Sequence, residues 1–337
     1  MLDTGREVDR YIIQSLVGEG GMAEVYRVRH AQLGTWHALK VLTIQSRSVR
    51  ERLVQEGRLQ ATLRHPNIAA VTDVLTVDGA PALLMEFIEG PSLERWLASY
   101  RPSLDEALAV LPGVLAGVRH AHGKGLIHRD LKPANVLMHV ADGAVVPKVA
   151  DFGLAKGGGA EEGRKKTKTG TTMGTPAYMA PEQIIDASKV DQRADVFSLG
   201  CILYELVTGV QPFYGDNIVE VFNKVSRGEY LPARHRVPDL PGNVVEAIEG
   251  ALRIDAAQRL PDCKALADLL AHDSEGQPLR IPMPTLLPEE SPGAEVARSI
   301  AAEMTSEWER SERTATQSPQ TWLAGSMAGE AAAPAPA

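Results

Sequence analysis

The spacing of apolar residues along the chain changes near residue 88. Before this point, apolar and polar residues alternate in short runs that end at glycine-containing turns, which is typical of β-strands. A helix is predicted over 47–64, ending before His65-Pro66, because the residue before a proline avoids the helical conformation. The first three strands have short connections, which predict an antiparallel meander. The predicted strands are 11–17, 24–29, 35–42, 69–77 and 82–87.

After Glu89-Gly90 the apolar residues recur at helical spacing instead. The sequence therefore predicts an α+β protein, in which a small β-rich half precedes a larger α-rich half. The predicted helices are 92–99, 104–124, 195–207, 217–227 and 244–254.

Residues 273–337 differ from the rest of the chain in composition. They contain eight of the 22 prolines and ten acidic against four basic residues, and they mostly lack apolar periodicity, which predicts a disordered tail. The exception is 295–313, where an apolar residue recurs every four positions from Val296 to Trp308. This segment is either an amphipathic helix that docks on the domain or on a partner, or a transient helix in a solvated tail.

Charge and composition exclude several classes of protein. The 337 residues include 35 Lys and Arg against 43 Asp and Glu, a net charge of −8, which argues against a nucleic acid as the main partner. Two cysteines, Cys201 and Cys263, can form neither a disulfide framework nor a four-ligand zinc site. The first ten residues lack the apolar core of a secretory signal, and no apolar run reaches the roughly 18 residues of a membrane span. We therefore expect a cytoplasmic protein without a membrane partner.

Two features of the β-rich half suggest phosphate chemistry. Residues 18–25 read Gly-Glu-Gly-Gly-Met-Ala-Glu-Val between two predicted strands, where glycines either form a hairpin turn or let backbone amides approach a phosphate. Lys40 lies in an apolar strand, and an ammonium that is buried there requires an anionic partner. Glu56 and nucleotide phosphates are the two candidate partners, and the alternative is a lysine at a strand end that points into solvent.

A polar cluster in the α-rich half suggests a catalytic loop. Residues 128–135 read His-Arg-Asp-Leu-Lys-Pro-Ala-Asn, a composition that disfavours both helix and strand and is typical of a loop that presents side chains to a site. Asp151 follows in the sequence Asp-Phe-Gly. Asp130, Asn135 and Asp151 together offer oxygens suited to Mg²⁺ and to accepting the proton of a hydroxyl.

The order and spacing of these clusters resemble the signature of the eukaryotic-like protein kinase family, over residues 11 to 270. The resemblance implies a two-lobed kinase domain over 11–272, with an N-lobe over 11–87 and a C-lobe over 88–272. It also implies that ATP and Mg²⁺, for which Mn²⁺ is an alternative, bind between the lobes. Lys132 after Asp130 and the segment 174–182 resemble Ser/Thr kinases, and residues 18–25 resemble those of bacterial members.

The resemblance also implies roles for individual residues. Asp130 would be the catalytic base, with Lys132 near the γ-phosphate and Lys40 at the α- and β-phosphates. Asn135 and Asp151 would hold the metal. Ala23 replaces the third glycine of the loop pattern and still allows the backbone to approach the phosphates. The nucleotide-binding residues would be Val17, Gly18, Glu19, Gly20, Gly21, Val25, Ala38, Lys40, Glu56, Met85, Glu86 and Ile88, with Met85 as gatekeeper and 86–88 as the adenine-binding hinge.

Three further positions resemble structural residues of the family. Asp195 resembles the buried acid that braces the catalytic loop, and Arg259 resembles the arginine that pairs with Glu182. Thr175 matches the threonine that contacts the catalytic loop. His120 and His122 predict no metal site, because residues two apart on a helix do not share a face.

Regulation is expected at the activation segment, 151–182. Arg129 precedes Asp130, and kinases with this arginine often require a phosphate on that segment. Thr171, eleven residues before Glu182, and Thr169 are the expected phosphorylation sites. Autophosphorylation through transient self-association would order the segment, and a plain polar loop is the alternative.

The predicted function is the transfer of the γ-phosphoryl group of ATP to Ser/Thr hydroxyls of proteins in signalling. Two other functions are less consistent with the sequence. A pseudokinase usually lacks one of Lys40, Asp130 and Asp151, and all three are present. A small-molecule kinase of related fold would be expected to lack the segment 174–182, which is also present.

Overall fold

The protein is described from a computed structural model. The described residues are 1–20, 23–43, 47–141, 144–152, 176–186 and 190–271. The chain divides into two compact units, Met1–Met283 and Pro284–Ala337, and all described residues belong to the first. The predicted tail, 273–337, with its segment 295–313, therefore lies outside the described residues.

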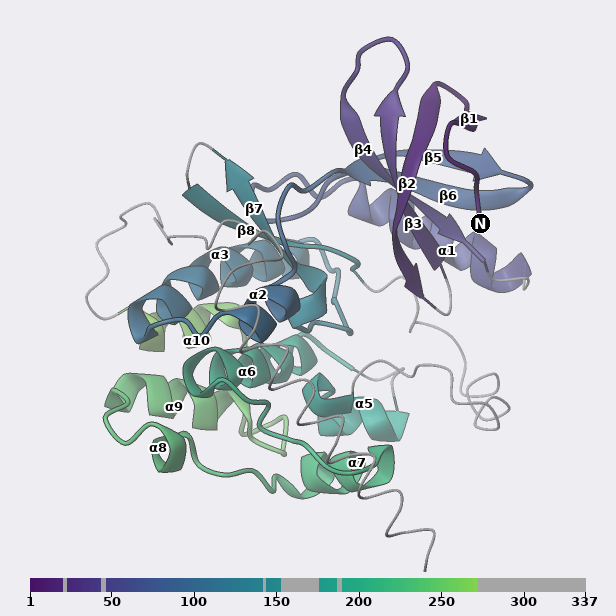
Figure 1. Ribbon diagram of the computed structural model, residues 1–337. Coiled ribbons are helices and arrows are strands. Elements are labelled where there is room, and N and C mark those ends of the chain that lie inside the picture. The colour runs from purple at the N-terminus through teal and green to yellow at the C-terminus, as the bar shows by residue number, and fades with distance from the viewer. Residues whose placement is uncertain (21–22, 44–46, 142–143, 153–175, 187–189, 272–337) are drawn as a thin grey trace, which may run out of the picture. The chain divides into compact units, whose positions relative to one another are not determined.

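The N-terminal part of the first unit is a six-stranded antiparallel sheet with one helix, α1 (Arg47–Gln60), packed against it (Figure 1). The strand order is β1-β2-β3-β4-β6-β5, so β2, β3 and β4 form the predicted meander. β4 then pairs with β6, and β5 lies at the edge. The strands are β1 (Glu7–Val8), β2 (Tyr11–Gly20), β3 (Ala23–His30), β4 (Trp36–Leu42), β5 (Val71–Val77) and β6 (Ala80–Glu86).

The two faces of this sheet have different roles because side chains alternate along each strand. Tyr26 and Val28 of β3 and Leu39 of β4 point into an apolar core, to which residues of β1 and β2 also contribute. The opposite face carries Val25, which pairs with Lys40, and the strand-to-strand pairs Arg27–Ala38 and Ala38–Met85. One face thus stabilises the sheet, and the other presents the predicted nucleotide-binding residues.

The following part is mainly helical and is organised around α6 (Arg193–Thr208), which is buried along nearly its whole length. A helix that is apolar on all sides needs partners all round, and α6 contacts α3 (Leu104–His122), α9 (Gly242–Ala251) and η2 (Pro176–Tyr178). The remaining elements are α2 (Leu93–Ser99), η1 (Pro133–Asn135), β7 (Val136–Ala141), β8 (Ala144–Val149), α5 (Pro181–Asp186), α7 (Ile218–Arg227), α8 (Ala233–Arg236) and α10 (Cys263–Leu270).

The hairpin β7–β8 connects the helical part to the sheet. The Val149 N–H donates to the Asn67 carbonyl at 2.9 Å, and the Ala69 N–H donates to the Val149 carbonyl at 2.9 Å. The Asn67 side-chain amide donates to the Pro147 carbonyl at 2.8 Å. The loop that leaves α1 is therefore hydrogen-bonded to β8, directly before Asp151.

The predicted α+β class and most predicted elements are confirmed, with several corrections. α1 ends at Gln60 instead of residue 64, and α3 ends at His122 instead of residue 124. As predicted, α3 continues through Pro112, which is exposed, so only its missing backbone hydrogen bond has to be tolerated there. The hairpin β7–β8 and the helix α10 were not predicted.

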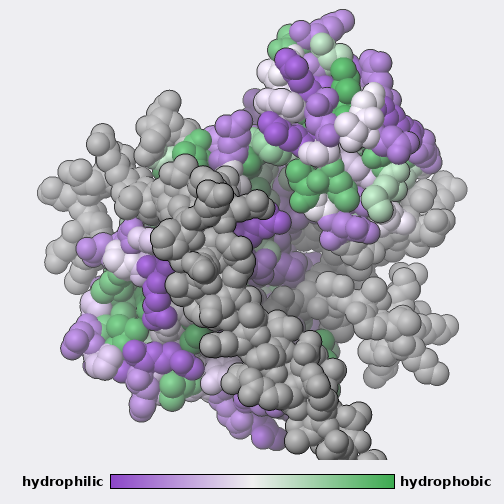
Figure 2. Space-filling model, in the orientation of Figure 1, coloured by the Kyte–Doolittle hydropathy of each residue, from purple (hydrophilic) through white to green (hydrophobic). Residues whose placement is uncertain are grey.

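On the face shown in Figure 2, hydrophilic side chains predominate over the N-terminal sheet, and the apolar residues among them are scattered. Scattered apolar residues are normal on a protein surface. Within the described residues, no helix is both long and apolar enough to cross a membrane.

Gly90 determines how the chain passes from β6 to α2. Its φ is +150°, and an added Cβ would lie 1.8 Å from the Met138 carbonyl oxygen of β7. On either side of it, the Glu89 carbonyl accepts from Val140 N–H and the Pro91 carbonyl accepts from Met138 N–H, both at 2.9 Å. The backbone at Gly90 therefore lies against β7 with no room for a side chain.

We predict that Gly90→Ala lowers the free energy of unfolding by about 3 kcal/mol or more, because the methyl group would displace the backbone of β7. Gly125→Ala is the matched control: its φ is +76°, but its added Cβ would meet nothing within 4 Å. The control should lose only about 1 kcal/mol, from the backbone conformation alone. Urea denaturation measures both, and equal losses would contradict the proposed close approach to β7.

Candidate active site

The predicted catalytic loop, 128–135, lies between α3 and β7 and ends in η1. His128 is fully buried, its ring lies 4.7 Å from the Phe152 ring, and its Nε2 is 2.9 Å from the Ala150 carbonyl oxygen. The Ala150 N–H donates to the Asn135 carbonyl at 2.9 Å. These contacts join both ends of the loop to the residues that precede Asp151.

Asp195, in the first turn of α6, is hydrogen-bonded to the backbone at the start of the loop. Its carboxylate has no exposed surface and accepts hydrogen bonds from the backbone N–H groups of His128 and Arg129, each at 2.8 Å. The role expected for Asp195 as a buried brace is therefore confirmed by its contacts. Bonds of this kind to an ionised carboxylate are strong, and they offset its desolvation.

His122 also contacts this carboxylate, a contact that was not predicted. Its Nε2 lies 2.7 Å from Asp195 Oδ2, and its Nδ1 lies 3.8 Å from the Cys263 sulfur in α10. His120 instead faces His65, at 5.1 Å between ring centroids and with the rings tilted by 32°. The two histidines face different partners, as their spacing predicted, and no cluster of metal-ligating side chains occurs in the part of the chain that the structure describes.

Two residues of the site have left-handed backbone conformations. Arg129 has φ +64° and Asp151 has φ +60°, values that are uncommon for residues with a side chain. Such conformations persist only where surrounding contacts impose them, and they concentrate at functional sites. At Arg129 these contacts are the bond from its N–H to Asp195 and the bond from the Gln183 side chain to its carbonyl, at 2.9 Å.

The polar side chains of the loop face one another. Lys132 Nζ lies 3.2 Å from Asp130 Oδ2. The Asn135 side-chain nitrogen donates to the Asp130 carbonyl at 2.7 Å and approaches its carboxylate at 3.3 Å. Because the nitrogen of Asn135 is used within the loop, the amide oxygen is the atom that remains for a cation.

Lys40 and Asp151 meet across the two parts of the unit. Lys40 Nζ on β4 lies 2.6 Å from Asp151 Oδ1, and the lysine side chain is largely buried. The alternative that Lys40 points into solvent is therefore wrong. The acidic partner in the structure is Asp151, which was not among the predicted ones, while the side chain of Glu56 on α1 lies outside the described residues.

The predicted nucleotide-binding residues line the end of the sheet next to these charges. Gly18 and Glu19 of β2 pair with Val25 and Glu24 of β3. Met85 is 6% exposed and Ile88 is 8% exposed, whereas Val17 is 45% exposed although it is apolar. Gly20 ends β2, and Gly21 lies outside the described residues.

The hinge, which we define as residues 86–88, is joined to the helical part by an ion pair that was not predicted. Lys148 on β8 is largely buried, and its Nζ lies 2.8 Å from Glu86 Oε1 and 3.0 Å from Glu86 Oε2. The pair could not be predicted because Glu86 and Lys148 are far apart in sequence. It fixes the position of the Glu86 side chain against β8.

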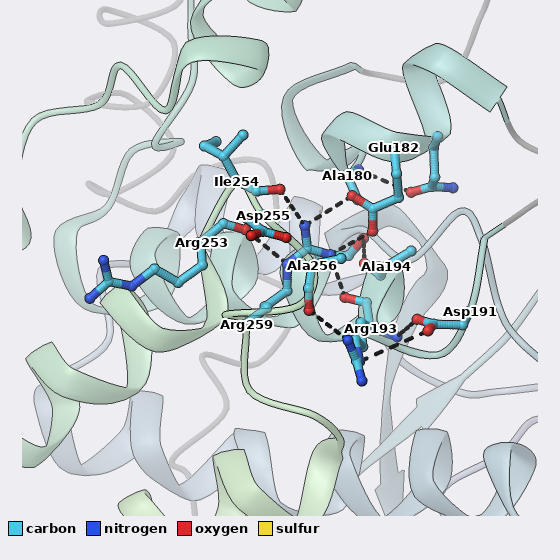
Figure 3. Close-up of polar contacts among 12 residues, drawn as sticks. Ala180, Glu182, Asp191, Arg193, Ala194, Arg253, Ile254, Asp255, Ala256 and Arg259 are labelled. Carbon is cyan, nitrogen blue, oxygen red and sulfur yellow. Dashed lines mark hydrogen bonds and ion pairs between the residues drawn. The ribbon is translucent and has the colours of Figure 1, made fainter.

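The end of the activation segment, at Glu182, is fixed by a further ion pair (Figure 3). Arg259 Nη1 and Nη2 donate to the two carboxylate oxygens of Glu182, at 2.6 and 2.9 Å, and the arginine side chain has no exposed surface. The expected pair is therefore confirmed. Arg259 also donates to the carbonyls of Arg193, Arg253 and Ile254, so its remaining N–H groups are satisfied.

The segment around Tyr178 forms a shallow pocket with the catalytic loop. The Tyr178 hydroxyl donates to Glu205 at 2.5 Å, and burial raises the pKa of both groups, with Glu94 as a further cause at Glu205. Thr169, Thr171 and Thr175 lie outside the described residues. The pocket is lined by Arg129, Asp130, Leu131, Lys132, Tyr178, Met179 and Ser198.

Comparisons with known proteins agree with this geometry. The family profile of the protein kinase domain matches residues 11–273. The serine/threonine-protein kinase PknA of Mycobacterium tuberculosis is 38% identical over 290 residues, which cover 83% of this chain and 64% of PknA. Serine/threonine-protein kinase pkn3 of Myxococcus xanthus is 35% identical over 79% of this chain, and the match spans only half of pkn3.

Two solved structures share the fold. The kinase domain of Mycobacterium tuberculosis PknI has a TM-score of 0.63 at 27% identity, covering 80% of this chain and 98% of that domain. Rad53 1-466 in complex with AMP-PNP has a TM-score of 0.64 at 26% identity, covering 78% of this chain and 64% of that chain. With its curled β-rich N-lobe, its helical C-lobe and these relatives, the chain belongs to the protein kinase family, on its bacterial, eukaryotic-like serine/threonine branch.

Proposed function

We propose that this chain transfers the γ-phosphoryl group of ATP to Ser or Thr hydroxyls of proteins. The observation that carries the proposal is the convergence of Lys40, Asp130, Lys132, Asn135 and Asp151. Lys40 of β4 contacts Asp151 after β8, and within the catalytic loop Asp130 contacts both Lys132 and Asn135. The Ala150 N–H, which donates to the Asn135 carbonyl, links the two groups. We place the kinase domain at 11–272, with an N-lobe over 11–87 and a C-lobe over 88–272.

The residues present fit a nucleotide with a divalent cation. The carboxylate of Asp151 and the amide oxygen of Asn135 are the hard oxygen ligands that Mg²⁺ or Mn²⁺ prefers. Val17 is an exposed apolar side chain that an adenine ring would cover, and Gly18 leaves room for a close approach of the backbone. Among the described residues, the Ile88 N–H donates to no backbone carbonyl, so it is available to a base.

In the proposed mechanism, the chain positions its reactants and offsets their charge. Asn135 and Asp151 would hold the divalent cation, which would supply positive charge against the charge that develops on the transferred group. Lys40 and Lys132 direct their ammonium groups toward the phosphates and stabilise the same charge. Asp130, next to Lys132 and Asn135, accepts the proton of the substrate hydroxyl and aligns it for in-line attack.

Arg129 supports a regulatory role for the activation segment. Its Nε is buried and has no hydrogen-bond partner within the described part of the chain. A phosphate on Thr171 or Thr169 would satisfy such a group. We propose that the chain phosphorylates one or both threonines through transient self-association.

The remaining parts of the proposal concern partners and location. The match covers about half of pkn3, so the protein substrates of the whole protein are inferred only as a class. We propose a cytoplasmic signalling role with no nucleic acid or membrane as partner. The alternative of a scaffold without transfer activity predicts ATP binding without phosphorylation.

The proposed chemistry predicts that Asp130→Asn lowers kcat at least about a hundredfold, because the substrate hydroxyl loses its acceptor. Lys40→Met should lower kcat/KM by about a hundredfold or more, because the phosphates lose a fixed cation. The measurement is transfer of labelled phosphate from ATP–Mg²⁺ to a generic basic protein. Asp191→Asn, an exposed aspartate near the start of α6, is the control and should stay active. Wild-type protein that binds ATP but transfers no label would contradict the proposal.

The proposed regulation predicts that label also appears on the chain itself. Thr169→Ala with Thr171→Ala should remove most of this label and lower activity toward the added substrate, because Arg129 then has no phosphate to bind. Thr167→Ala with Thr172→Ala, in the same segment, is the matched control and should retain both. Peptide mapping locates the label, and full activity in the first double variant would contradict the regulatory proposal.

A further inference from the structure

Arg27 on β3 contacts two aromatic rings. Its guanidinium carbon is 3.8 Å from the centre of the Trp36 ring and 4.9 Å from the centre of the Phe87 ring. Both distances are within the range of cation–π attraction. Trp36 begins β4, and Phe87 is the middle residue of the hinge, so the arginine connects two strands of the sheet to the hinge.

This contact lies on the face of the sheet that carries the proposed nucleotide site. Arg27 pairs with Ala38, and Ala38 pairs with Met85, so the three side chains share one face. Trp36 lies two residues before Ala38 in the sequence, and Phe87 lies two residues after Met85. The Arg27 contact therefore continues the surface that would enclose the adenine.

The guanidinium is partly removed from water. Arg27 Nε is buried and, among the described residues, has no hydrogen-bond partner. Burial of an arginine nitrogen without an acceptor is unfavourable unless another attraction offsets it. Cation–π attraction is strongest where the cation is desolvated, and two rings supply it here.

Each residue of the hinge is held by a different group. Glu86 forms the ion pair with Lys148, and its N–H donates to the Ala70 carbonyl at 2.8 Å. Ile88 is buried in a small apolar cluster with Ala69 and Ala150. Between them, the Phe87 ring faces the Arg27 guanidinium.

We propose that Arg27 is a positioning residue for adenine binding. Stacked on Trp36, its guanidinium holds Phe87 and so fixes the backbone between Glu86 and Ile88, which would contact the base. The inference rests on the proposed use of ATP and adds a determinant of base affinity that lies outside the phosphate-binding and catalytic residues.

A purely structural role for Arg27 makes different predictions. Replacing a partly buried arginine by methionine keeps the apolar stem and removes the buried N–H groups, so the fold should lose little. If Arg27 only stabilised the sheet, affinity for all ligands would change together. If it positions the hinge, affinity for the base should fall while affinity for phosphates stays.

The experiment measures the dissociation constants of ATP–Mg²⁺ and of inorganic tripolyphosphate–Mg²⁺, which lacks the base, by calorimetry on the full chain. Arg27→Met should weaken ATP about tenfold and leave tripolyphosphate unchanged. In steady-state assays it should raise the KM for ATP with little change in kcat. Arg29→Met is the matched control, because Arg29 lies 5.8 Å from the same Trp36 ring, has an exposed side chain and bonds to Gly34. Both of its affinities should be unchanged.

A second variant tests the contact itself. Phe87→Leu should weaken ATP as Arg27→Met does, and the double variant should be no weaker than either single one, because both remove the same contact. Thermal unfolding verifies that each variant is folded. Equal ATP affinity in wild type and Arg27→Met, equal losses for ATP and tripolyphosphate, or fully additive losses would each overturn the inference. A wild-type chain that binds no ATP would instead overturn the proposed function on which it rests.

Discussion

The arrangement of the catalytic loop depends on the buried carboxylate of Asp195. It accepts hydrogen bonds from the N–H groups of His128 and Arg129, and His122 Nε2 also contacts it. Removal of the carboxylate would leave two backbone donors unsatisfied near the core, and removal of the donors would leave a buried charge uncompensated. The same bonds impose the left-handed conformation at Arg129, so the adjacent Asp130 is directed toward Lys132 and Asn135. A buried helix thereby determines the geometry of an accessible site.

Three charge pairs lie at this site, and two of them connect the lobes. Lys40 pairs with Asp151, Lys132 with Asp130 and Lys148 with Glu86, at 2.6, 3.2 and 2.8 Å. The first and last of these join the sheet and the hinge to the segment around β8, so the predicted nucleotide-binding side chains are placed by contacts from both lobes. These lysines are not alike in their environment: Lys40 and Lys148 are largely buried, and Lys132 is more accessible. A buried lysine side chain has a defined direction, because its ammonium must stay next to the acidic group that offsets its desolvation.

The sequence was sufficient for the fold class, because local patterns carry that information. Local composition together with the resemblance to a known family predicted which segments would form the candidate site. Alternation marks the strands of the sheet, and the polar, proline-containing composition of 128–135 marks the loop. Contacts between distant segments left no local pattern: Lys148 with Glu86, Lys40 with Asp151, and Arg27 with Phe87. Boundaries such as the end of α1 at Gln60 and the end of α3 at His122 also depended on tertiary packing. Asp195 and Arg259 were anticipated because their positions resemble those of a known family, and the structure confirms both contacts.

Amide hydrogen exchange measures whether Asp195 positions the catalytic loop through its bonds to two backbone amides. Asp195→Asn keeps the size of the side chain but places a donor where one backbone donor now binds. Exchange at His128 or Arg129 should become at least about a hundredfold faster, while amides in the middle of α9 should keep their protection. Asp191→Asn, with an exposed side chain, should alter neither region. Unchanged protection at both His128 and Arg129 in Asp195→Asn would contradict the account.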